Sequence, residues 1–171
     1  MSSITTALLA LAVVRVLALA VFADRWFRIR TSEHFLLTLG WLILAGGSLG
    51  ALLFTSRTPV FPACAAAGVV LLAGAAAHYF SRRIHTSAIL AVAAAGAALV
   101  LIASAFQPHL AGTVSVIVHA IVLTAALITM IRSRSALRRI APGSFNWLVL
   151  TCLALALHAF IMITQTPATL G

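Results

Sequence analysis

Long apolar runs separated by short polar segments make up nearly the whole sequence. The runs span residues 4–23, 35–55, 62–80, 88–106, 112–130 and 145–163. Each is close to the ~20 residues that an α-helix needs to cross the hydrocarbon core of a bilayer. The pattern predicts an all-α, polytopic membrane bundle in which six transmembrane helices form three successive hairpins. Residues 1–171 are then a single integral membrane domain.

The polar segments alternate between arginine-rich and arginine-poor. The arginine-rich segments hold Arg25, Arg28 and Arg30, then Arg82 and Arg83, then Arg132, Arg134, Arg138 and Arg139. The intervening segments carry only Arg57, and the chain begins with an uncharged stretch before its first apolar run. Because positively charged loops remain on the cytoplasmic side, we expect a multi-pass protein of the cell (inner or plasma) membrane with both termini outside.

Composition excludes a soluble domain of any size. The chain is 63% hydrophobic and only 8% charged, whereas soluble domains carry about 25% charged residues. Its net charge of +9 comes from eleven arginines against two carboxylates. In a membrane protein such arginines face anionic lipid headgroups, so we expect lipid contacts at the inner loops and no nucleic acid.

The sequence offers little catalytic chemistry. Its two acidic residues, Asp24 and Glu33, are placed in one predicted loop, and no metalloprotease, P-loop or nucleophile-elbow motif is present. We therefore expect a non-enzymatic membrane subunit or module that packs its helices against partner membrane proteins or a second copy. Gly46 and Gly50 are four residues apart and would let another helix approach closely, although packing within the chain uses the same residues.

Arg15 is the least expected residue, because it interrupts the first apolar run about eight residues before its predicted inner end. A buried charge of this kind is a functional hypothesis by default. It could pair with an anionic ligand group or with a carboxylate on a partner subunit. The alternative, which we favour, is that its side chain snorkels to the inner headgroups or bonds backbone carbonyls.

His119 and His158 are expected at similar depths, roughly 10 and 8 Å, on two antiparallel helices. Two facing imidazoles could ligate a b-type haem, which would make this an electron-transfer protein, or could hold a transition metal. With Ser115 and Thr151 they could instead line the path of a small proton or cation transporter or channel. The alternative, which we favour, is a pair of neutral histidines bonded to backbone carbonyls. We expect the histidines at inner helix ends, namely His34, His78 and His85, to be solvated.

Overall fold

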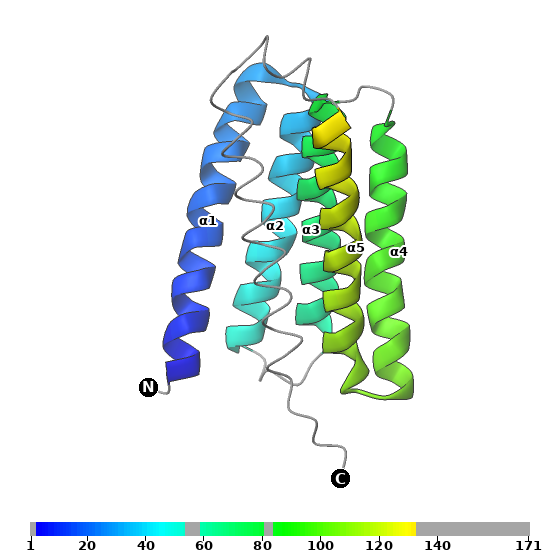
Figure 1. Cartoon of the computed structure of the whole chain (residues 1–171). Helices are drawn as coiled ribbons and strands as arrows, with labels where there is room; N and C mark the ends of the chain where they lie inside the picture. Colours follow the sequence, from blue (N-terminus) through cyan, green and yellow to red (C-terminus); the bar gives the residue numbers. More distant parts are fainter. Residues whose placement is uncertain (1–2, 54–58, 81–83, 133–171) are drawn as a thin grey trace.

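The computed structural model describes residues 3–53, 59–80 and 84–132, and all regular structure within these residues is α-helical. Its helices are α1 (Ser3–Ile29), α2 (Ser32–Leu53), α3 (Val60–Phe80), α4 (Thr86–Phe106) and α5 (Leu110–Arg132) (Figure 1). Helices α2 to α5 are each long and apolar enough to cross a membrane. The all-α class is therefore confirmed, and four membrane-spanning candidates are present in the described part of the chain. The predicted sixth helix, 145–163, lies outside the described residues.

Helix α1 continues six residues beyond the predicted span, through a segment that the sequence analysis assigned to a loop. This segment contains no glycine or proline, and Arg28 Nε donates to Asp24 Oδ1 at 2.9 Å across one helical turn. The helix ends where Arg30 adopts a left-handed conformation with φ 57. The loop between α1 and α2 is thus much shorter than predicted, and Arg25 and Arg28 are helical residues.

The remaining helices begin two or three residues before their predicted spans, where polar residues and prolines favour a helix start. Glu33 lies in the first turn of α2, where its negative charge interacts favourably with the helix dipole. Pro62 lies in the first turn of α3, where the missing N–H would have no partner in the helix. Pro108 lies in the turn between α4 and α5.

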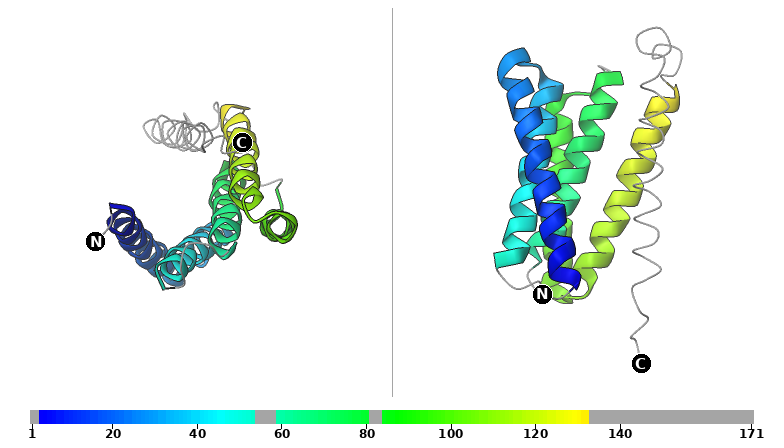
Figure 2. Two further views of the ribbon diagram at one scale, coloured as in Figure 1. Left: turned by 90° about the horizontal axis from the view of Figure 1, so that it is seen from below. Right: turned by 90° about the vertical axis from the view of Figure 1, so that its left-hand side faces the viewer.

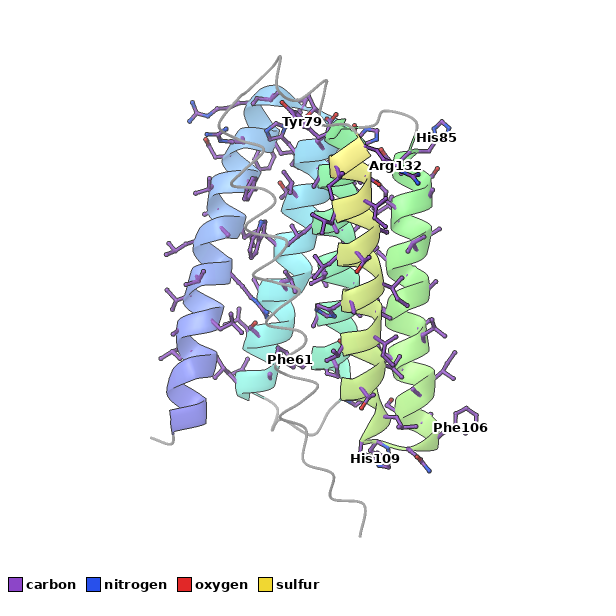
Figure 3. The ribbon with its side chains drawn as sticks, viewed as in Figure 1. Phe61, Tyr79, His85, Phe106, His109 and Arg132 are labelled. Carbon is purple, nitrogen blue, oxygen red and sulfur yellow. The ribbon has the colours of Figure 1, made fainter. Side chains whose placement is uncertain are left out.

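Consecutive described helices run in opposite directions. The α1–α2 and α3–α4 connections lie at one end of the bundle, where His85 and Arg132 are also found, and we call this the arginine end (Figure 3). The C-terminal ends of α2 and α4 and the N-terminal ends of α3 and α5 lie at the opposite end, which we call the far end and which includes Phe106 and His109. Viewed end-on, α1, α2, α3 and α5 follow a curved row, and α4 lies outside it against α3 and α5 (Figure 2).

The most extensive packing joins α2 to α3, across the boundary between the first two predicted hairpins. A Cβ added to Gly40 would lie 3.2 Å from the Gly68 carbonyl oxygen, and a Cβ added to Gly68 would lie 3.2 Å from the Gly40 oxygen. A Cβ added to Gly47 would lie 2.7 Å from Cys64 Cβ. The two backbones are therefore in near contact, so the hairpins do not pack as independent units.

Small side chains on α3 make this close approach possible. Ala67 and Ala75 are buried, and Leu71 is only 1% exposed in the same cluster as Leu36 of α2. Small residues let helix backbones come close enough for extensive van der Waals contact, which drives helix association where lipid removes the hydrophobic driving force. Helix α3 is thus the centre of the described bundle.

Candidate functional site

Arg15 lies near the middle of α1, which spans 27 residues. Its Nη1 group donates to Ser48 Oγ and, at 3.3 Å, to the Leu44 carbonyl oxygen of α2. Ser48 Oγ itself donates to the same carbonyl oxygen at 2.9 Å. The guanidinium carbon is 6.0 Å from the centre of the Phe61 ring at the start of α3. Arg15 therefore connects three helices, and its contacts are those of the carbonyl-bonding alternative.

The guanidinium lies toward the far end, whereas we expected a snorkelling side chain to reach the headgroups at the arginine end. Cα–Cβ bonds in an α-helix tilt toward the helix N-terminus, which for α1 is the far end. Ser48, which accepts the hydrogen bond, is five residues before the end of α2 and so about 8 Å from that end. The direction of the side chain could have been predicted from this tilt.

Arg15 belongs to the stripe of α1 that faces α2. Within this stripe Ala12 is buried, and Phe22 stacks on Trp41 of α2 with ring centroids 6.4 Å apart. The ring centroids of Trp26 and Phe35 are 5.7 Å apart. The opposite face of α1 is exposed. Helical spacing thus places the charge in the seam between α1 and α2.

No side-chain carboxylate of this chain is placed to neutralise Arg15. Asp24 pairs with Arg28, and Glu33 Oε1 lies 3.8 Å from His78 Nε2 at the arginine end. These are the only two acidic residues in the sequence. Asp24 is nine residues from Arg15 along α1, which corresponds to roughly 13 Å. The guanidinium has polar neighbours but no anionic one.

His34 and His78 are half-buried at the arginine end, whereas His85 is exposed as expected. His78 Nδ1–H donates to the Ile84 carbonyl oxygen at 2.6 Å, and its Nε2 lies 3.0 Å from Ser32 Oγ. His34 Nδ1 lies 2.7 Å from Thr31 Oγ1. Because His78 contacts Ser32 at the start of α2 and Ile84 before α4, its position fits a structural role, and both His34 and His78 stay partly exposed.

His119 is half-buried on α5, and its Nδ1–H donates to the Ser115 carbonyl oxygen at 2.6 Å. Ser115 Oγ donates to the Pro62 carbonyl oxygen at 2.9 Å and so joins α5 to α3. His158 and Thr151 lie outside the described residues. The haem, metal and proton-path hypotheses therefore stay predictions. The absorption spectrum and metal content of protein purified from haem-replete cells would decide the haem and metal hypotheses, and proteoliposome flux after His119→Ala and His158→Ala would test the proton path. Among the described residues, no three metal-ligating side chains come together.

The predicted packing pair on α2 faces away from α3. A Cβ added to Gly46 or Gly50 would meet no atom within 4 Å, whereas Gly40 and Gly47 contact α3. Sequence analysis missed the pair Gly40 and Gly47, although these glycines are seven residues apart and therefore lie on one helical face. Helix α2 thus has one glycine face that packs against α3 and another that no described residue covers, which we call the open glycine face.

A cavity of about 320 Å³ between α3, α4 and α5 was also not predicted. It is lined by small and branched apolar side chains such as Ala73, Ala88, Ile121 and Ala125, with Thr129 as its one polar side chain. Such a lining can accommodate an acyl chain or apolar side chains and offers no group for acid–base chemistry.

No protein-family model matches this chain, and no curated protein and no solved structure is significantly similar to it. Function must therefore be inferred from the residues themselves.

Proposed function

We propose that this protein is a non-enzymatic, multi-pass membrane subunit that acts by packing its helices against partner membrane proteins or a second copy of itself. The observation that carries the proposal is the open glycine face of α2. Leu42, Gly46, Leu49 and Leu53 recur at helical spacing on this face, and the three leucines are exposed. Leucines on either side of a glycine form a shallow groove into which a second helix can pack.

Glycine destabilises a helix interior, and this supports a contact between the open glycine face and another protein. Glycine in a helix interior costs about 1 kcal/mol relative to alanine. At Gly40 and Gly47 the close contact with α3 offsets that cost, because a Cβ there would collide with α3. Gly46 and Gly50 gain no such contact from any described helix. A second protein that approaches as closely as α3 does would supply it.

Replacing the open glycines tests the proposal directly. We expect Gly46→Leu and Gly50→Leu to convert a larger assembly, seen by native mass spectrometry of protein extracted in mild detergent, into smaller species. Each substitution should not lower the unfolding free energy and should raise it by up to about 1 kcal/mol, because it removes a glycine from a helix interior and no described atom lies within 4 Å of either site. The matched control is Gly112→Leu on α5, where an added Cβ also meets no atom within 4 Å and where assembly should be unaffected. A wild-type protein that is active as a lone monomer would contradict the proposed function.

The proposed topology has six spans in the inner or plasma membrane, with the arginine end in the cytoplasm and both termini outside. The distribution of arginine supports it, as does the placement of the α1–α2 and α3–α4 turns at one end of the described bundle. The sixth span rests on the apolar run 145–163 alone.

Cysteine labelling tests this orientation in a background in which Cys64 and Cys152 are replaced by serine. We expect an impermeant thiol reagent added outside intact cells to label Ser3→Cys and Thr58→Cys but not Ser135→Cys. Labelling of Ser135→Cys should require permeabilised membranes. The opposite pattern would reverse the orientation, because the reagent cannot cross the bilayer.

A further inference from the structure

Neither of the two side-chain carboxylates of the sequence pairs with Arg15. The guanidinium group has five N–H donors, of which the structure pairs only those of Nη1 with Ser48 and Leu44. Its Nε and Nη2 have no hydrogen-bond partner among the described residues, and both acidic side chains of the sequence are engaged at the arginine end. A charge inside a membrane protein is costly unless it is paired or reaches water.

The position of the guanidinium favours a carboxylate from another protein over a lipid phosphate. The group is held at the level of Ser48, about 8 Å short of the far end of α2, and lies against the Phe61 ring. Lipid phosphates lie beyond the hydrocarbon core, which has about the length of one helix of this bundle. In the sequence, the segment between α2 and α3 holds only Arg57, so we expect little attraction of anionic lipid at the far end.

We propose that Arg15 pairs with an aspartate or glutamate on a transmembrane helix of a partner protein, which docks along the α1–α2 seam. This inference rests on the proposed function, since it specifies the chemistry of the partner. Ser48 and Leu44 anchor Nη1, and this holds the planar guanidinium in one orientation. Its Nε and Nη2 then form the fork that binds a carboxylate through two parallel hydrogen bonds. The partner helix carries its carboxylate about one and a half turns from its own far-end boundary.

A designed peptide tests the proposal without knowledge of the natural partner. The full-length protein is placed in phosphatidylcholine vesicles and labelled with a donor dye at its N-terminal amine, which is selective because the chain has no lysine. The probe is a leucine/alanine transmembrane peptide with one glutamate six residues from its end and an acceptor dye. Matched peptides carry glutamine or leucine at that position. We expect the glutamate peptide to associate about tenfold more tightly than the leucine peptide, as interhelical polar pairs do in model peptides.

Variants of the protein assign the effect to Arg15. Arg15→Gln should abolish the preference for the glutamate peptide, because the variant has no positive charge and no guanidinium fork at this position. Arg25→Gln removes a charge outside the seam and should leave the preference unchanged. Equal binding of the glutamate and leucine peptides by the wild-type protein would overturn the proposal, and this result does not depend on whether any variant folds.

The lipid alternative and the proposed function are separated by two further measurements. If phosphatidylglycerol vesicles abolish the glutamate preference that phosphatidylcholine vesicles show, an anionic lipid headgroup occupies Arg15 in place of the carboxylate, and the partner-helix proposal is wrong for anionic membranes. If the native assembly is present and disrupted by Gly46→Leu but no glutamate preference exists, the inference fails while the proposed function stands. A glutamate preference in a protein that is monomeric in its native membrane supports the Arg15 pairing and overturns the subunit function.

Discussion

Gly68→Leu should destabilise the bundle by about 1–3 kcal/mol, the usual cost of forcing a side chain into a packed core. A Cβ at this position would collide with the Leu44 side chain and lie 3.2 Å from the Gly40 carbonyl oxygen. The Leu44 side chain can rotate away, but the carbonyl oxygen belongs to the α2 backbone, so the two helices must separate. Unfolding in mixed micelles of dodecylmaltoside with increasing dodecylsulfate, followed by loss of helical circular dichroism, would measure the effect.

The matched substitution for this experiment is Gly46→Leu, which introduces the same side chain into the neighbouring helix. An added Cβ there meets no described atom within 4 Å, so this variant should be no less stable than the wild-type protein. Both variants lose one glycine from a helix interior, and the propensity terms therefore cancel. Equal destabilisation by the two substitutions would show that α2 and α3 do not pack through Gly40 and Gly68.

Leu71→Ala should cost about 2–5 kcal/mol, because it leaves a cavity at the centre of the described bundle. Leu71 is 1% exposed on α3 and packs in a cluster with Leu36, Ala67 and Ile89, so three helices lose contacts together. The same unfolding measurement applies. The control is Leu99→Ala on α4, where the leucine is 55% exposed and the substitution should cost less than about 0.5 kcal/mol. A larger effect at Leu99 than at Leu71 would mean that α3 is not the packing centre.

Helix existence and approximate length were predictable because a membrane forces each apolar run to satisfy its backbone hydrogen bonds internally. For this reason the runs at 35–55, 62–80, 88–106 and 112–130 correspond to α2, α3, α4 and α5 with starts only two or three residues away. The end of α1 was not predictable from hydropathy. Asp24, Arg25 and Arg28 end the apolar run, but they are compatible with a helix that continues into the interface.

The arrangement of the candidate site required the tertiary structure. Sequence analysis singled out Arg15 as an unusual charge, yet its hydrogen bond to Ser48 and its approach to Phe61 join residues far apart in the chain. The depth of the guanidinium depended on the true length of α1 and on the tilt of its side chain toward the helix N-terminus. His119 bonds the carbonyl oxygen of Ser115, four residues before it, and this contact is local enough to be anticipated from helical spacing.

What the sequence by itself determined is the set of apolar helices, their alternating connections and the concentration of arginine at alternate loops. Only the tertiary structure decided that Gly40, Gly47 and Gly68 pack within the chain and that Gly46 and Gly50 face outward. In a water-soluble protein the apolar face of a helix identifies the core. In a membrane, lipid tails are as apolar as leucine, so hydropathy does not distinguish the buried side of α2 from its exposed side, and leucine and glycine occur on both. Helix packing is then decided by shape and close contact, which hydropathy along the chain does not record.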